Sequence, residues 1–253
     1  MNKKKVLVLG VGAQGSAAAR KLDREPDVSE IVCADIDRTA VDSLVSELTK
    51  ATGATVDAHS KDSIVEAARG VDLILNGLPL ECTKNVLDAA LEVKANYQDY
   101  AATTSLDEDW VESIRIQYDV YGPRFKEIGR LAIVGTGSAP GLICAATRDA
   151  MRYLDTCDTI YNIVWEGVEA KRFLPFWWSP VTALHDMSEK GYAFENGRLI
   201  RLEAFEHPVW RQYEEADHEL VFVEHCHDEP IHYSFNAEKF FKGAKNAYFK
   251  YAG

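Results

Sequence analysis

The feature that most constrains the fold is a glycine-rich turn close to the start of the sequence. Residues 5–9 (KVLVL) form an apolar run typical of a parallel strand buried on both faces, and GVGAQG follows at residues 10–15. The next residues, SAAARKL, favour a helix, and a second apolar run ends at Asp35. A GxGxxG motif between a strand and a helix, with an acid about 20 residues further on, is typical of a dinucleotide-binding domain.

Each position of this motif has a physical role. Gly10 permits a tight turn, Gly12 lets the backbone approach a pyrophosphate, and Gly15 lets the helix pack close to the strand. The phosphates would then lie at the helix N-terminus, where unpaired N–H groups face them. At the end of the second strand, Asp35 would accept hydrogen bonds from the adenosine ribose and repel a 2′-phosphate, which favours NAD. Arg38 lies close by and leaves NADP open. The alternative is an α/β turn that binds no phosphate.

Strands and helices continue to alternate through the first half of the sequence. The pattern predicts helix 39–51, strand 54–59, helix 63–70, strand 71–79, helix 83–94 and strand 96–101. Such alternation is typical of a parallel sheet. We therefore expect a doubly wound Rossmann-type α/β domain over residues 1–143.

The fourth strand ends on the carboxyl edge of the predicted sheet, where ligands of such sheets bind. Its last residues are Gly77, Leu78 and Pro79, which we expect to face the cofactor; the alternative is a plain strand-ending turn. The predicted cofactor-binding residues are Gly10, Gly12, Ala13, Gln14, Gly15, Asp35, Ile36, Arg38, Gly77, Leu78 and Pro79.

Four segments together resemble the saccharopine dehydrogenase family, which includes lysine 6-dehydrogenases and related polyamine-forming reductases. They are GVGAQG, DLILNGLP, YQDYA and GTGSAPGL at residues 135–142. The resemblance covers most of the chain. It implies that the turn from Tyr97 to Asp99 and the turn at Pro140 and Gly141 frame the nicotinamide and the substrate.

The position of Asp99 supports the same prediction without the resemblance. An acid at the carboxyl end of a strand could bind a substrate amine, so Asp99 is a candidate catalytic residue. The alternative is that Asp99 caps the helix predicted at 104–114, although Thr103, Thr104 and Ser105 are better candidates for that cap.

The alternation stops near residue 144, and the second half predicts a different architecture. Strand patterns at 159–167, 197–205 and 219–227 are separated by turn signals such as FENG. We expect an α+β substrate domain with an antiparallel or mixed sheet over residues 144–253. An aromatic block between the first two of these strands contains Trp178 and Ser179. Family members carry a similar Trp-Ser-Pro element near the substrate, whereas the alternative is a hydrophobic plug over the sheet.

The segment HCHDEP at residues 225–230 also resembles a family element. His227 is a candidate general acid or base because its ordinary pKa lies near neutrality, and Glu229 could hold a cationic amino group. The alternative is an acidic turn before a proline. We expect no metal site, because His225, Cys226 and His227 are consecutive in a predicted strand and point to opposite faces.

Charge and composition narrow the classes of partner. The formal net charge of -12 argues against nucleic acid. We find no run of about 20 apolar residues that could cross a membrane and no secretory signal, so we expect a cytoplasmic protein. The five cysteines are scattered and form no CxxC pair, which is typical of reduced core residues.

The resemblance also implies a function and an assembly. It implies an NAD(P)-dependent oxidoreductase that acts on the C–N bond of an amino acid or polyamine, by oxidative deamination or imine reduction. The alternative is a non-catalytic nicotinamide-nucleotide-binding subunit of a two-chain complex. Family members are longer, so we expect the substrate domain to be truncated. Either the polypeptide is shortened, or a second chain completes the domain. We expect a homo-oligomer, such as a dimer.

Overall fold

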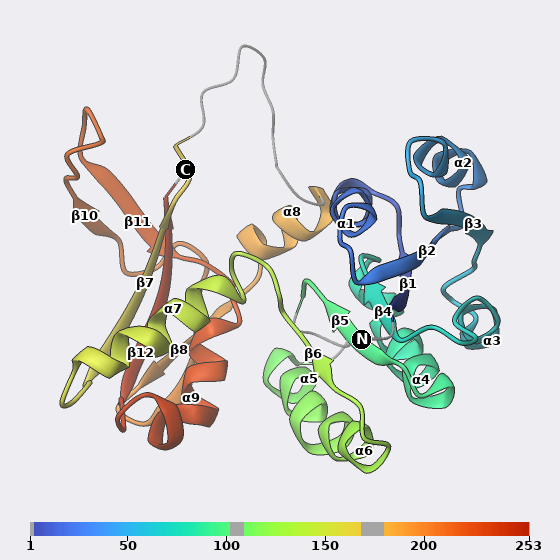
Figure 1. Ribbon diagram of the computed structural model, residues 1–253. Helices are drawn as coiled ribbons and strands as arrows, with labels where there is room; N and C mark the ends of the chain where they lie inside the picture. Colours follow the sequence, from blue (N-terminus) through green and yellow to red (C-terminus); the bar gives the residue numbers. More distant parts are fainter. Residues whose placement is uncertain (1–2, 102–108, 168–179, 253) are drawn as a thin grey trace. The chain divides into compact units, whose positions relative to one another are not determined.

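The computed structural model describes residues 3–101, 109–167 and 180–252 (Figure 1). The chain divides into two compact units, residues 1–137 and 138–253, and each is described by itself. The sequence-based boundary at 143/144 falls within helix α7 (Leu142–Ala150) instead.

The first unit contains a parallel sheet with the strand order β3-β2-β1-β4-β5-β6. Its strands are β1 (Lys4–Leu9), β2 (Val28–Asp35), β3 (Ala51–Thr55), β4 (Leu73–Asn76), β5 (Asn96–Asp99) and β6 (Ala132–Ile133). Its helical segments are α1 (Ala13–Asp23), α2 (Arg38–Ser46), α3 (Lys61–Ala67), η1 (Leu80–Cys82), α4 (Thr83–Val93), α5 (Trp110–Ile116), η2 (Gln117–Tyr121) and α6 (Gly122–Glu127). This strand order confirms the predicted Rossmann-type domain.

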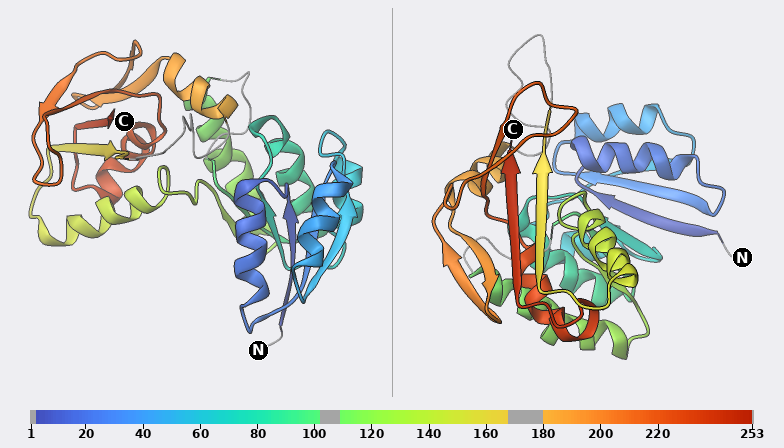
Figure 2. Two further views of the ribbon diagram at one scale, coloured as in Figure 1. Left: turned by 90° about the horizontal axis from the view of Figure 1, so that it is seen from above. Right: turned by 90° about the vertical axis from the view of Figure 1, so that its left-hand side faces the viewer.

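Helices cover both faces of this sheet. Alternate residues of β1 point to opposite sides, so that Val6 and Val8 pack in one core while Leu7 and Leu9 pack in another. The first core lies under α1 and α2, and the second lies under α3 and α4 (Figures 1 and 2). The continuous apolar run of β1 is therefore explained by burial on both faces.

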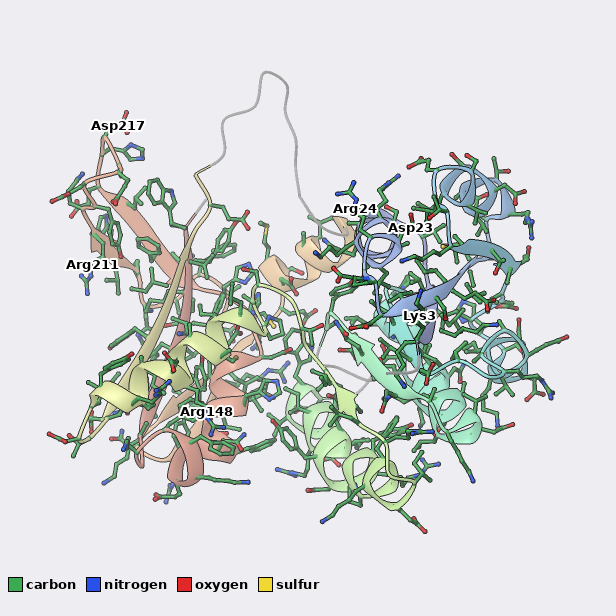
Figure 3. The ribbon with its side chains drawn as sticks, viewed as in Figure 1. Lys3, Asp23, Arg24, Arg148, Arg211 and Asp217 are labelled. Atoms are coloured by element: carbon green, nitrogen blue, oxygen red, sulfur yellow. The ribbon has the colours of Figure 1, made fainter. Side chains whose placement is uncertain are left out.

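The predicted boundary between the second helix and the third strand of this unit is wrong. Helix α2 ends at Ser46 and β3 begins at Ala51, whereas the pattern predicts a helix to residue 51 and a strand at 54–59. The carboxylate of Asp23 accepts hydrogen bonds from the backbone N–H groups of Thr49 and Lys50 at 3.0 and 2.8 Å, so these donors are not available to a helix (Figure 3). The tertiary contact therefore overrides the local pattern.

The second unit has a mixed sheet with the strand order β10-β11-β12-β8-β9, and β7 pairs with β12 in parallel. Its strands are β7 (Thr159–Trp165), β8 (Gly191–Glu195), β9 (Arg198–Leu202), β10 (Val209–Arg211), β11 (Leu220–Glu224) and β12 (Asn246–Ala252). Its helices are α7 (Leu142–Ala150), η3 (Met151–Tyr153), α8 (Pro180–Ser188) and α9 (Glu229–Phe240). The predicted α+β domain with a mixed sheet is confirmed.

Helices α7 and α9 pack together on one face of this sheet. Tyr233 and Phe241 of the α9 region join Phe194 of β8 and Ala247 of β12 in the core. The guanidinium of Arg148 on α7 lies 3.8 Å from the ring centroid of Phe240 on α9 (Figure 3). Neither α9 nor the short strands β8 and β10 were predicted from the sequence.

The predicted FENG turn is a tight hairpin between β8 and β9. Asn196 and Gly197 both have positive φ angles, 50° and 77°, as a two-residue hairpin turn of type I′ requires.

All five cysteines are free, and burial raises the pKa of Cys33 and Cys144 to about 11, which keeps these thiols protonated. Within the described ranges, none of the helices has the length and apolar character needed to cross a membrane.

Candidate functional site

The glycine-rich turn between β1 and α1 is closely packed against the end of β4. Gly10 has a φ angle of 82°, and a Cβ atom there would lie 2.8 Å from the carbonyl oxygen of Gly77. A Cβ atom on Gly15 would lie 1.8 Å from the carbonyl oxygen of Gly10. Both positions therefore exclude any larger residue, because the opposing atoms belong to the backbone.

Gly12 has the opposite surroundings. A Cβ atom on Gly12 would meet no heavy atom within 4 Å, and Gly12, Ala13 and Gln14 are exposed. Gly12 is the N-cap of α1 and provides no side-chain cap for the first N–H groups of this helix. The turn thus leaves a bare backbone and unpaired helix donors facing open space, an arrangement that fits the diphosphate of a dinucleotide.

Asp35 lies at the end of β2, next to this turn. Its Oδ2 accepts a hydrogen bond from the N–H of Val11 at 2.8 Å, and its Oδ1 accepts one from the N–H of Asp37 at 3.1 Å. The carboxylate therefore holds the glycine-rich turn in place. Ile36 is 68% exposed, and the Arg38 guanidinium lies 2.7 Å from the carboxylate of Asp42, one turn further along α2.

The segment after β4 closes the other side of the turn. The N–H of Gly77 donates to the carbonyl oxygen of Leu9 at 2.8 Å, and the N–H of Leu78 donates to Oδ1 of Asn76 at 3.1 Å. Pro79 is exposed. The structure thus brings the predicted residues Gly77 and Leu78 together with Gly10 at one edge of the sheet.

Asp99 is buried rather than presented at the surface of this edge. It is 2% exposed, its Oδ2 accepts a hydrogen bond from the Tyr97 hydroxyl at 2.7 Å, and its Oδ1 accepts one from the N–H of Gly135 at 2.7 Å. Burial raises the pKa of Asp99 to about 7, although these two hydrogen bonds lower it. Its side chain does not cap a helix, because Asp109 caps α5 by accepting from the N–H of Val111.

The remaining predicted substrate residues lie in or near the second unit. Gly141, with a φ angle of 126°, is the N-cap of α7, and Pro140 precedes it. Trp178 and Ser179 lie outside the described residues, so their predicted roles stay predictions.

His227 and Glu229 form an ion pair where the chain enters α9. Nδ1 of His227 lies 2.8 Å from Oε2 of Glu229, whose side chain is 0% exposed, whereas that of His227 is 16% exposed. The His227 ring stacks on Phe249 of β12, with 4.0 Å between ring centroids. Although burial lowers the pKa of His227, the Glu229 carboxylate and the nearby Asp186 and Asp228 raise it to about 9. The imidazole is therefore positively charged at neutral pH.

His225 is a buried neighbour that the sequence analysis did not select. It is 6% exposed, and its ring centroid lies 5.6 Å from that of His227. Burial and the His227 charge lower the pKa of His225 to about 4, so it is neutral. Among the described residues, neither of its ring nitrogens has a hydrogen-bond partner.

The premise of the metal argument was wrong, because the strand ends at Glu224 and the three residues HCH lie beyond it. The alternation of a strand therefore does not apply to these residues, and the ring centroids of His225 and His227 lie 5.6 Å apart. Within the described part of the chain, no three His, Cys, Asp or Glu side chains are grouped so that they could hold a metal ion. The repeated histidine two residues apart was the only sequence signal for this pairing.

Comparison with known proteins places this geometry in context. Residues 6–133 match the family described as the saccharopine dehydrogenase NADP binding domain. A carboxyaminopropylagmatine dehydrogenase from Synechocystis sp. is 24% identical over 248 residues, which are 92% of this chain and 57% of that protein.

Two solved structures share the fold at low sequence identity. The apo saccharopine dehydrogenase (L-Glu forming) from Saccharomyces cerevisiae has a TM-score of 0.72 at 13% identity and covers 98% of this chain. A myo-inositol dehydrogenase from Corynebacterium glutamicum has a TM-score of 0.54 at 14% identity, with 99% of this chain and 68% of that chain covered. The present chain spans 55% of the yeast protein and 57% of the Synechocystis protein, which is about half the length of each.

Proposed function

This chain belongs to the saccharopine dehydrogenase family, and from that premise we propose that it is an NAD(P)-dependent oxidoreductase that acts on the C–N bond of an amino acid or polyamine. The observation that carries the proposal is the contrast among the three glycines of the turn. Gly10 and Gly15 are closed against backbone atoms, whereas Gly12 faces open space. A bare backbone that is open only at the middle glycine suits a diphosphate.

The first unit would hold the coenzyme, which supplies the hydride chemistry when it is bound. The N–H groups at the start of α1 would bind the diphosphate, and Asp35 would accept from the adenosine ribose. We propose NAD as the preferred coenzyme. The Asp35 carboxylate would repel a 2′-phosphate, and the Arg38 guanidinium that could attract one is held by Asp42.

The second unit would supply the proton. Because Nδ1 of His227 is bound to Glu229, the proton on Nε2 is the one that His227 can give. During imine reduction the substrate nitrogen gains a proton as its carbon gains hydride, so a charged His227 suits that direction. In the reverse direction a neutral His227 would take the proton back. Glu229 keeps the imidazolium charged and oriented.

A turnover assay with the full chain tests this proposal. The protein is incubated with NAD or NADP and a panel of lysine, ornithine, diamines and saccharopine-like opines, and formation of the reduced coenzyme is followed by absorbance. We expect turnover with at least one of these amines, and a loss of roughly 10²- to 10⁴-fold in kcat for His227→Gln. His232→Gln is the matched control, because His232 is a neutral histidine of α9 with a pKa lowered to about 4 by burial. Turnover that His227→Gln leaves unchanged would refute the role of His227.

One observation favours a second candidate function, a non-catalytic nucleotide-binding subunit of a two-chain complex. Asp99, the acid predicted to bind the substrate amine, is 2% exposed and is hydrogen-bonded to Tyr97 and Gly135 inside the first unit. Coenzyme binding without turnover on the whole panel would support this candidate over the oxidoreductase.

A further inference from the structure

A chain of hydrogen bonds runs across the carboxyl edge of the first unit, below the predicted coenzyme site. It begins at the N–H of Leu78, which donates to Oδ1 of Asn76 at 3.1 Å. Nδ2 of Asn76 donates to the Tyr97 hydroxyl at 3.0 Å, and that hydroxyl donates to Oδ2 of Asp99 at 2.7 Å. From the other end, the N–H of Gly135 donates to Oδ1 of Asp99 at 2.7 Å.

The three side chains that form this series of hydrogen bonds are almost inaccessible to solvent. Asn76 is 3% exposed, Tyr97 is 1% exposed and Asp99 is 2% exposed. A buried polar group that loses its partner destabilises the protein far more than an exposed one, because water does not replace the lost bond. The fold therefore strongly favours the one arrangement in which each of these buried polar groups has a hydrogen-bond partner.

The direction of the donors explains why an acid is needed. Leu78 and Gly135 lie at the two ends, and both give backbone N–H groups, so the hydrogen bonds run inward from both sides. Some group between them has to accept from both sides, and each of the two oxygens of a carboxylate can accept one of these hydrogen bonds. Asp99 fills this position. An amide there would offer one oxygen and one NH₂ group, so its NH₂ group would oppose one of the two donors that face this position, the Tyr97 hydroxyl and the Gly135 N–H.

The two ends of the chain are functionally different segments. Leu78 belongs to the turn that packs its Cδ2 against the Gly10 position of the glycine-rich turn, where an added Cβ would lie 3.2 Å away. Gly135 and the next residue, Thr136, whose N–H donates to the Asp99 carbonyl oxygen at 3.0 Å, are among the last residues of the first unit. The network thus ties the floor of the coenzyme site to the turn that leads out of this unit.

We propose that Asn76, Tyr97 and Asp99 are positioning residues that hold the Leu78 turn and the Gly135 turn in one fixed arrangement, so that the glycine-rich turn is ready for the coenzyme. This inference rests on the proposed function, because coenzyme affinity is what the network serves. None of the three side chains needs to touch the coenzyme. Their effect is transmitted through Leu78 to Gly10.

The test compares the affinity for NADH with thermal stability in single and double variants. Asp99→Asn and Tyr97→Phe are expected to raise the Kd for NADH roughly tenfold, the scale set by one buried hydrogen bond. The double variant is expected to raise the Kd no further than the stronger single change, because both changes break the same hydrogen-bond network. Tyr121→Phe is the matched control: Tyr121 is 4% exposed, and its hydroxyl donates at 3.2 Å to Asp88, which is not a member of this network.

The outcomes separate this inference from the proposed function. An unchanged Kd in Asp99→Asn and Tyr97→Phe, with the wild type binding NADH, overturns the network and leaves the proposed function standing. An equal rise in Tyr121→Phe overturns it also, because general loss of packing then explains the effect. A wild type that binds neither NADH nor NADPH overturns both. If Asp99→Asn does not fold, Tyr97→Phe alone decides, since it keeps the buried ring.

Discussion

A single methyl group at Gly12 should abolish tight coenzyme binding without harming the fold. The backbone of Gly12 is extended, with φ -64° and ψ -161°, so its φ is one that alanine adopts, and the added Cβ meets no heavy atom within 4 Å. The change in the free energy of unfolding for Gly12→Ala should therefore stay within about 1 kcal/mol, the scale of a glycine or N-cap substitution.

The effect on binding should be much larger. The methyl group would occupy the space through which a diphosphate reaches the first N–H groups of α1. Hydrogen bonds to charged groups contribute about 1.5–3 kcal/mol each. Loss or distortion of one or two of them gives about 3 kcal/mol, or roughly a hundredfold rise in the Kd for NADH.

Two further glycine variants make the comparison sharp. Gly15→Ala would place a Cβ 1.8 Å from the carbonyl oxygen of Gly10, so it should lower stability by about 1–3 kcal/mol or more and impair binding through the fold. Gly122→Ala is the control outside the turn: its nearest atom would lie at 3.5 Å, so it should leave the Kd for NADH unchanged, whatever an alanine before Pro123 costs in stability. The Kd for NADH is measured by calorimetric titration of all three glycine variants, and their thermal unfolding is followed by circular dichroism. If Gly12→Ala binds NADH as tightly as the wild type, the reasoning about the turn is refuted.

Three other changes test the charged groups. Asp35→Asn keeps an oxygen for the N–H of Val11 but removes the charge, so the ratio of Kd for NADPH to Kd for NADH should fall roughly tenfold in titrations; an unchanged ratio contradicts the assigned role. The raised pKa of His227 stabilises the fold fully below pH 6.5, and this stability is lost as pH rises through about 9. The loss amounts to at most about 3 kcal/mol and should vanish in Glu229→Gln, as urea unfolding across this pH range will show. Lys250→Met leaves Glu224 buried without its counter-charge and should lower the free energy of unfolding by about 3–5 kcal/mol in the same assay.

The sequence predicts those parts of the site that depend on local geometry. The roles of Gly10, Gly12 and Gly15 follow from their spacing between a strand and a helix, and the structure gives each position the contacts that these roles require. The place of Asp99 at a strand end was also predictable. Its inward orientation was not, because the donor that holds it, Gly135, reaches it only after β6 pairs with β5.

Helix α9 shows why the second unit was harder to predict. Its sequence, EPIHYSFNAEKF, contains histidine and aromatic residues that are weak helix formers, so intrinsic propensity gives little signal. The helix is stabilised by packing of Tyr233 against the sheet. The proline at its second position was the available clue, since proline is favoured in the first turn of a helix. The pairing of His227 with Glu229 depends on this helix start, and the sequence analysis, which gave the two residues separate roles, did not predict it.

The distribution of these groups separates two kinds of selectivity. The residues predicted to bind the dinucleotide, from Gly10 to Pro79, lie in the first unit, and the His227–Glu229 pair assigned to proton transfer lies in the second. Asp99, which could have joined the two tasks, is committed to Tyr97 and Gly135. Coenzyme choice and amine choice should therefore change independently. Asp35→Asn should alter the NADPH to NADH ratio and leave the order of preferred amines unchanged, whereas Glu229→Gln should lower kcat/KM for amines and leave the Kd for NADH within twofold, a margin of about 0.4 kcal/mol. A Glu229→Gln variant that loses NADH affinity would show that the two tasks share one set of contacts.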